Sequence, residues 1–358
     1  MSSLVDKNDS RSDSPIPQQV LDILYGYNAS QCLISACELG IFDVLAGPPQ
    51  SAQSLSQQLS TNQDATGRLL DVLVNLELLE THKSDEGERV YRVNSPLADC
   101  LTKASPLGFL NRVKNFQVTE RPLFQSLTSA VREGSNRWSH VFNLPEEKVF
   151  HNLYNNHDNL MVFLELMQGY VKPTAPNFIA AFDLSRYKQM CDLGGCTGDI
   201  AYAACTAYPD MKITILDLPQ VVKCSSHFTP TLDECPNQQN VSYVEGDFFE
   251  PKLPPADLYV LTHIIHDWSE EKIDILLSNV FNNLSSGGGI LIGESVLFDD
   301  KCGPLHAQYM SLVMLVTCEQ GARERSGPEY QRLLVKHGFK DVQIKFTCLL
   351  DAVLAVKP

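Results

Sequence analysis

The sequence of 358 residues has no apolar run of about 18 residues, the length that a membrane-spanning helix needs. Its polar start, MSSLVDKNDSRSDSPIPQQ, also lacks the apolar stretch of a secretory signal. The 11 cysteines are scattered and form no C-x-x-C pair, which favours reduced thiols over a disulfide framework or a zinc site. These absences predict a cytoplasmic protein with no membrane partner and no metal.

Positive charge is scarce as well. The sequence has 28 Lys and Arg residues and 43 Asp and Glu residues, which gives a formal net charge of −15. The largest basic clusters, Arg323/Arg325 and Arg112/Lys114, are short, so we expect no nucleic-acid partner. The apolar content of 44% is typical of a globular protein, and the length indicates two domains.

The N-terminal region has the pattern of a small helical domain. Residues 1–15 are polar and predict a disordered tail. Helices are expected at 20–40, 51–59 and 66–79. A strand hairpin is expected to follow, with its strands at 78–82 and 89–93. Three helices followed by a hairpin resemble a winged helix. The hairpin region is acidic, which favours a structural or dimerising role for residues 16–105 over DNA binding.

The next segment, 106–185, reads as mostly helical, and its run Leu160–Tyr170 is apolar nearly all round, which predicts burial. From residue 186 onward short apolar runs alternate with amphipathic stretches, which is typical of βαβ units and a parallel sheet. The last two runs, 342–346 and 352–356, are too close for a crossover. We therefore predict an α/β fold whose sheet ends in an antiparallel strand pair.

The first strand-to-helix turn reads Asp192-Leu-Gly194-Gly195-Cys-Thr-Gly198. Leu193 breaks the G-x-G-x-x-G nucleotide pattern, and the acidic residue before the glycines would repel a pyrophosphate. The turn suits a phosphate-free ligand such as S-adenosylmethionine, whose amino group would favour a nearby carboxylate. A tight strand-to-helix turn that binds no ligand would have the same sequence pattern.

The next two strands also end in carboxylates. Asp217 follows the last loop glycine by 19 residues, where it can accept hydrogen bonds from both ribose hydroxyls. The third strand ends in Gly246-Asp247-Phe248, which could bind and stack on an adenine. Because open α/β sheets bind ligands at the carboxyl edges of their strands, these residues predict a cofactor site.

The fourth strand, expected over 258–265, runs into His263-Ile-Ile-His266-Asp267-Trp268. A histidine beside the cofactor edge is placed to act as a general base. Glu294, at the end of the fifth strand, and Glu324 could each orient His266, although Glu324 could also be a solvated residue. Trp268 could stack on adenine or simply pack. A metal pair of His263 and His266 is the weaker alternative, because no third ligand stands at metal-site spacing.

Several motifs together resemble the class II small-molecule O-methyltransferases that use S-adenosylmethionine, and in particular the acetylserotonin O-methyltransferase branch. The resemblance spans residues 17–358 and rests on ACELGIFDVLA, YRVNSPLADCL, DLGGCTG, KITILDLPQVV, EGDFFE, HDWSEEK and GGGILIGESVL. It implies a winged-helix-like dimerisation domain, a helical segment that closes the site, and a Rossmann-like methyltransferase domain over 186–358, in a homodimer.

The resemblance also implies roles for individual residues. Gly194, Asp217, Asp247 and Phe248 would hold the cofactor, and Tyr154 would reach it from the helical segment. Beside these residues, the strand-end positions Gly246, His263 and Trp268 are predicted to contact the cofactor. His266 would be the general base, flanked by Glu294 and Glu324, and Asp267 would face the substrate.

Four departures from the family pattern concern the cofactor loop and the acceptor pocket, and the chain also lacks the Trp that the branch has near Val171. Cys196 stands where the family has Gly, His263 where the branch has Arg, and Val313 and Thr317 where the branch has Asn and Gln. Because Val313 and Thr317 replace two side-chain amides, the acceptor pocket is expected to bind the amide of N-acetylserotonin less well than the pocket of that branch does. We predict methyl transfer to a small hydroxylated aromatic molecule. A non-catalytic scaffold of the same fold is the alternative, and Leu193 disfavours an NAD-dependent oxidoreductase.

Overall fold

The computed structural model describes residues 16–105, 107–145 and 153–358 and divides into two compact units, Met1–Gln117 and Val118–Pro358. The predicted tail, 1–15, lies outside the described residues. The division falls within the segment 106–185, which is helical over most of its described length, including a π-helical turn at Phe116–Glu120. None of the described helices is long and apolar enough to cross a membrane.

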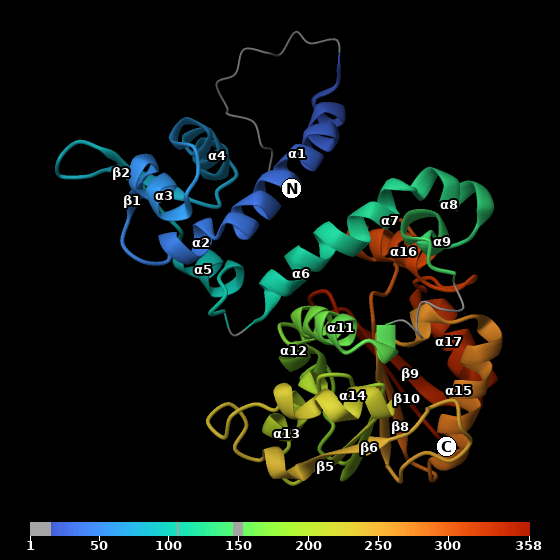
Figure 1. Ribbon diagram of the computed structural model, residues 1–358. Helices are drawn as coiled ribbons and strands as arrows, with labels where there is room; N and C mark the ends of the chain where they lie inside the picture. Colours follow the sequence, from blue (N-terminus) through green and yellow to red (C-terminus); the bar gives the residue numbers. More distant parts are fainter. Residues whose placement is uncertain (1–15, 106, 146–152) are drawn as a thin grey trace. The chain divides into compact units, whose positions relative to one another are not determined.

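The N-terminal unit is winged-helix-like, as predicted (Figure 1). Its helices are α1 (Gln18–Leu39), α2 (Ile41–Leu45), α3 (Ala52–Leu59), α4 (Gln63–Asn75), α5 (Ser95–Leu101) and α6 (Phe109–Asn115). Its antiparallel sheet has the order β1 (Gln50–Ser51), β3 (Arg89–Arg92) and β2 (Glu80–Lys83), and β1 was not foreseen. Helix α1 ends at Gly40, which adopts a left-handed conformation that glycine favours.

The C-terminal unit contains a seven-stranded sheet with the order β6-β5-β4-β7-β8-β10-β9. The strands are β4 (Gln189–Leu193), β5 (Lys212–Asp217), β6 (Val241–Glu245), β7 (Leu258–Thr262), β8 (Gly289–Glu294), β9 (Lys340–Lys345) and β10 (Asp351–Val356). The first five pair in parallel, and β10 pairs antiparallel with both β8 and β9. The predicted antiparallel end of the sheet is confirmed.

Helices cover both faces of this sheet (Figure 1). Successive β7 residues show why, since Leu258 and Val260 join the core under α12 and α13, whereas Tyr259 and Leu261 join the core under α15 and α17. The helices of the unit are α7 (Arg121–Gln125), α8 (Leu127–Glu133), α9 (Trp138–Phe142), α11 (His157–Val171), α12 (Ala175–Ile179), α13 (Asp199–Ala207), α14 (Pro219–Cys224), α15 (Glu270–Asn283), α16 (Leu305–Thr317) and α17 (Gly327–Lys336).

Two predictions for this unit are wrong in detail. The segment Leu160–Tyr170 lies in α11 but is not buried all round, because Leu160 and Leu164 pack inward while Val162 is 52% exposed. The fourth strand was expected to reach Ile265 but ends at Thr262. His263 has φ +53°, a left-handed conformation that turns the chain out of the strand into a short 3₁₀ turn, Ile265–Asp267.

Candidate active site

The predicted base, His266, lies in the 3₁₀ turn after β7 and is 3% exposed. Its Nδ1 lies 2.7 Å from Oε1 of Glu324 and 2.9 Å from Oε2 of Glu294, both of which are buried. Its Nε2 lies 3.5 Å from Oδ1 of Asp267. The structure therefore brings together His266, Glu294 and Glu324, as the sequence predicted, and puts one ring nitrogen against the two glutamates.

The backbone next to His266 is fixed by hydrogen bonds with two buried side chains, Glu294 and Arg325. Oε1 of Glu294 accepts from the amides of Ile264 (3.1 Å) and Ile265 (2.9 Å). The buried Arg325 donates from Nη1 to the carbonyl of Ile265 and from Nη2 to Glu270. Sequence analysis gave Arg325 no role here. The only signal was its place directly after Glu324.

The charges of this cluster are strongly coupled. Burial lowers the pKa of His266, but the carboxylates of Glu294, Glu324 and Asp267 raise it well above its usual value. Burial disfavours the charged form of Glu294, yet His266 lowers the pKa of that carboxyl below its ordinary range. Burial raises the pKa of Glu324 to about 7. Glu294 is therefore the carboxylate that stays ionised beside the imidazole.

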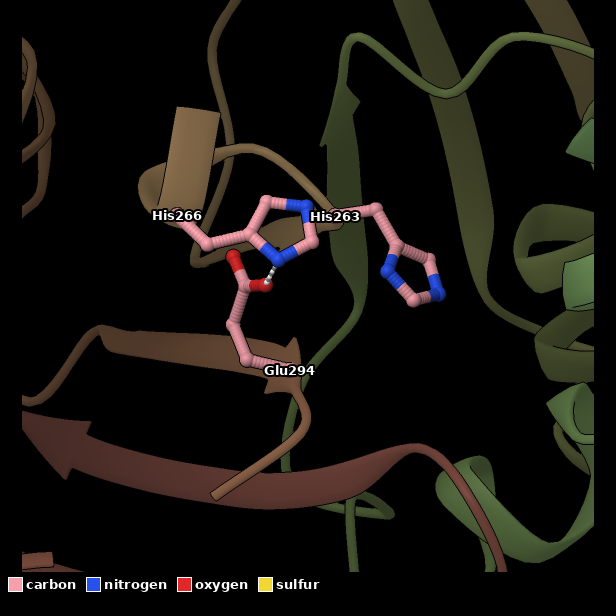
Figure 2. Close-up of side chains that lie close together, drawn as sticks. All are labelled: His263, His266 and Glu294. Atoms are coloured by element: carbon pink, nitrogen blue, oxygen red, sulfur yellow. Dashed lines mark ion pairs between the residues drawn. The ribbon is translucent and has the colours of Figure 1, made fainter. Parts of the chain in front are cut away.

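His263 lies at the edge of the same cluster (Figure 2). Its ring centroid is 5.4 Å from that of His266 and 6.2 Å from that of Tyr170 in α11. On the other side, Asp267 accepts a hydrogen bond from the thiol of Cys318 at 3.1 Å. Cys318 follows α16 and was not foreseen as a neighbour of the site.

A second group of predicted residues surrounds the loop between β4 and α13. Asp217 is buried at the end of β5, and its carboxylate accepts hydrogen bonds from the amides of Cys196 (2.8 Å) and Leu218 (2.7 Å). Burial nevertheless raises the pKa of Asp217 to about 6. Tyr154 packs against the same buried apolar cluster as Cys196 and Leu218, which places it in the region of this loop.

Asp192, near the end of β4, has no hydrogen-bond partner among the residues that the structure describes. It is fully buried, and neither carboxylate oxygen has a hydrogen-bond partner among the described residues. Burial and the nearby Asp217 and Asp199 raise its pKa to about 7. A buried carboxylate without a partner is costly, so this one is expected to be matched by a ligand.

The glycines of the loop allow close approach to neighbouring elements. A Cβ at Gly194 would lie 2.7 Å from Ile264 and 3.2 Å from Phe248, so this loop touches both the His263–His266 turn and the segment after β6. A Cβ at Gly246 would lie 2.6 Å from Leu216. The loop therefore joins the predicted cofactor residues to the turn that carries His266.

The remaining predicted residues lie on the outer side of this region. Asp247 is exposed, and its Oδ1 accepts from the amide of Phe249. Phe248 packs on Phe249 with ring centroids 4.8 Å apart, and Phe249 packs edge-on against Trp268 at 5.1 Å. Asp247 thus differs from Asp192 and Asp217, which are buried.

Comparisons with known proteins show which family the chain resembles. Residues 124–340 match the model of the O-methyltransferase domain family, and residues 21–104 match that of the O-methyltransferase dimerisation domain. The chain is 36% identical to acetylserotonin O-methyltransferase of Homo sapiens, over 94% of this chain and 96% of that one. It is also 36% identical to the enzyme of the same name from Gallus gallus, over 98% and 100%.

A solved structure shows the same fold. The crystal structure of human N-acetylserotonin methyltransferase in complex with SAM aligns with a TM-score of 0.89 and 35% sequence identity, over 98% of this chain and 99% of that one. The family-model matches, the sequence identity and the fold lead to one conclusion: the chain belongs to the O-methyltransferase family.

Proposed function

We propose that this protein transfers a methyl group from S-adenosylmethionine to a small hydroxylated aromatic molecule, with His266 as the general base. The observation that carries the proposal is the environment of His266. Its Nδ1 lies against Glu324 and Glu294, while its Nε2 is the nitrogen left to accept a proton. This is how a carboxylate orients an imidazole for base catalysis.

The loop after β4 fits a cationic cofactor without a phosphate at this position. Asp192 supplies a buried carboxylate without a partner, and a side chain at Gly194 or Gly195 would collide with its neighbours. Asp217 would hold the ribose hydroxyls, while Gly246, Asp247, Phe248 and Trp268 would border the adenosyl group, with Tyr154 and His263 at the edges. When bound, S-adenosylmethionine supplies an electrophilic methyl group.

The residues of the chain accept the proton that the acceptor hydroxyl loses. The acceptor hydroxyl gives its proton to Nε2 of His266, while Nδ1–H donates to the glutamates, which stabilise the imidazolium that forms. Such base catalysis contributes on the order of 10²–10⁴-fold in rate. Asp267, 3.5 Å from Nε2, is assigned to the acceptor. Holding the two reactants in line supplies the rest of the acceleration.

The C-terminal half of α16 supports an acceptor that is aromatic and largely apolar. Met310, Val313 and Met314 form a buried cluster, against which Cys318 packs beside Asp267. The hydroxyl of Thr317 donates to the carbonyl of Val313 at 2.7 Å and is used within the helix. Thioether and aliphatic groups suit aromatic rings better than amides.

We also propose that the protein is a homodimer. Residues 21–104 match a dimerisation domain, and the first half of α1 exposes apolar side chains, with Ile23 75% and Leu24 65% exposed. Sedimentation equilibrium should give twice the mass of the chain. A monomer at micromolar concentration would contradict the proposal.

The decisive test of activity is methyl transfer from isotope-labelled S-adenosylmethionine to a panel of hydroxyindoles, catechols and simple phenols, read by mass spectrometry. We expect one or more phenols to gain the labelled methyl group. Tight binding of S-adenosylhomocysteine in calorimetry together with no product across the panel would indicate a non-catalytic scaffold instead.

A further inference from the structure

Three side chains of metal-ligating type meet where β7 and β8 end. His263, His266 and Glu294 each offer one ligand atom, and these atoms lie within 4.8 Å of one another (Figure 2). His266 and Glu294 are buried and His263 is half-buried. Two imidazoles and a carboxylate are a donor set that Zn²⁺ and neighbouring divalent ions prefer. Glu294 is the third ligand that the spacing in the sequence did not reveal.

The distances are close to those of a bound ion. Ligand atoms at about 2.1 Å from a tetrahedral zinc lie about 3.4 Å from each other. Nδ1 of His266 and Oε2 of Glu294 are 2.9 Å apart, so they need only a small opening. His263 is half-buried at the rim, and one of its ring nitrogens lies within 4.8 Å of the other two ligand atoms.

The surroundings already orient these ligands. The other oxygen of Glu294 accepts two backbone amides, which leaves Oε2 for an ion. Glu324 adds an oxygen 2.7 Å from the same imidazole nitrogen. The two amides fix the geometry of Glu294 as a ligand, whereas an oxygen as close to Nδ1 as that of Glu324 would itself coordinate the ion. With Asp267 nearby, the local charge also favours a dication.

We propose that His263, His266 and Glu294 bind a divalent first-row ion, of which Zn²⁺ is the best match, and that this ion inhibits methyl transfer. The ion takes the place of the proton that the neutral ring of His266 carries on Nδ1, and a proton moves through water to Nε2, so the metal-bound imidazole stays neutral. Nε2 is then protonated and has no lone pair for the acceptor's proton. The inhibition rests on the proposed function, whereas the binding does not.

Binding is tested by calorimetry of Zn²⁺ with the full chain and by the absorption spectrum of Co²⁺. We expect one equivalent of Zn²⁺, and Co²⁺ bands typical of nitrogen and oxygen ligands. His263→Asn keeps a residue that tolerates positive φ and removes the imidazole. It should weaken Zn²⁺ binding by about tenfold or more, since even partners behind the ligands contribute 10- to 100-fold.

Two controls separate this site from others. His337 pairs with Asp274 at 2.9 Å elsewhere on the unit, so His337→Ala should leave the bound equivalent unchanged. Cys302 and Cys348 are exposed, so the double change to Ser tests for thiolate binding. Undiminished Zn²⁺ affinity in His263→Asn, or its loss in the cysteine variant, would overturn the site.

The functional half has its own readout. In the native chain, Zn²⁺ should inhibit methyl transfer over the concentration range in which it binds, and a chelator should restore the rate. A fully active enzyme with Zn²⁺ bound at this site would overturn the inhibition. A chain that binds Zn²⁺ through His263 but methylates nothing would contradict the proposed function and still support the metal site.

Discussion

Buried carboxylates lie at two places along one edge of the sheet, and they are paired differently. Glu294, the last residue of β8, has an imidazole and two amides as partners, and its pKa is lowered despite burial. Asp192, near the end of β4, has no hydrogen-bond partner among the described residues, and its pKa is raised to about 7. Burial is the same in both cases, so the partner decides the charge. The carboxylate of Glu294 pairs with His266, whereas the carboxylate of Asp192 is available for a ligand.

The largest expected effect is at His266. Changing His266 to Ala should lower the rate of methyl transfer by about 10²–10⁴-fold, the usual worth of a general base, while the affinity for S-adenosylhomocysteine stays within about twofold. Steady-state rates and calorimetry measure the two quantities. His337→Ala is the matched control, because that histidine also pairs with a carboxylate. Full turnover in the His266 variant would remove the assigned role.

Glu294→Gln tests whether the partnered carboxylate acts through His266. The amide keeps an acceptor for the two backbone amides but loses the charge beside Nδ1. We expect the rate to fall by about 10- to 100-fold, the equivalent of one charge-assisted hydrogen bond of about 1.5–3 kcal/mol. Glu324→Gln should cost less, because the pKa of Glu324, at about 7, leaves that group partly protonated. The reverse order of the two variants would show that Glu324 is the main partner.

Asp217→Asn addresses the cofactor side. Loss of a charged acceptor should weaken binding of S-adenosylhomocysteine by about 10- to 100-fold, with a smaller effect on the rate at saturation. Asp257 is a suitable control, because it also accepts two backbone amides, from Lys188 and Gln189, at the opposite end of β4. Equal affinities in the native chain and the Asp217 variant would exclude Asp217 from the cofactor site.

The smallest expected effect is a pH dependence of binding that comes from Asp192. A cationic cofactor favours the ionised carboxylate, so affinity for S-adenosylmethionine should fall as the pH drops through about 7, with a further loss near 6 from Asp217. Calorimetry between pH 5.5 and about 8 measures this slope. In Asp192→Asn the part of the slope near pH 7 should disappear.

The carboxyl of Asp192 has the opposite effect on the stability of the free protein, which falls as the pH rises. Its folded pKa lies above its unfolded value, so folding takes up a proton, and stability falls as the pH rises between about 4 and about 7. Asp192→Asn should therefore raise the Tm at pH 8, by about 2–4 °C for each kcal/mol gained. A lower Tm would show that Asp192 has a stabilising partner in the free protein.

Much of the fold followed from local patterns. The alternation of short apolar runs with helical stretches predicted the parallel strands, and the short link before Asp351 predicted their antiparallel end. Strand β1 was missed because two residues carry no period. The turn at His263 was missed because a left-handed histidine has no sequence signal comparable to that of glycine. The predicted cytoplasmic location stays a prediction.

The sequence by itself determined which chemical groups stand at the strand ends, because each of Asp192, Asp217, His266 and Glu294 follows or ends an apolar run. Only the tertiary structure decided their partners. Glu324 is 58 residues from His266 and meets it through the packing of the loop before α17. Asp192 is fully buried and has no hydrogen-bond partner within the described part of the chain. Periodicity along a chain reports burial, whereas partnership depends on distances between segments that lie far apart in the chain.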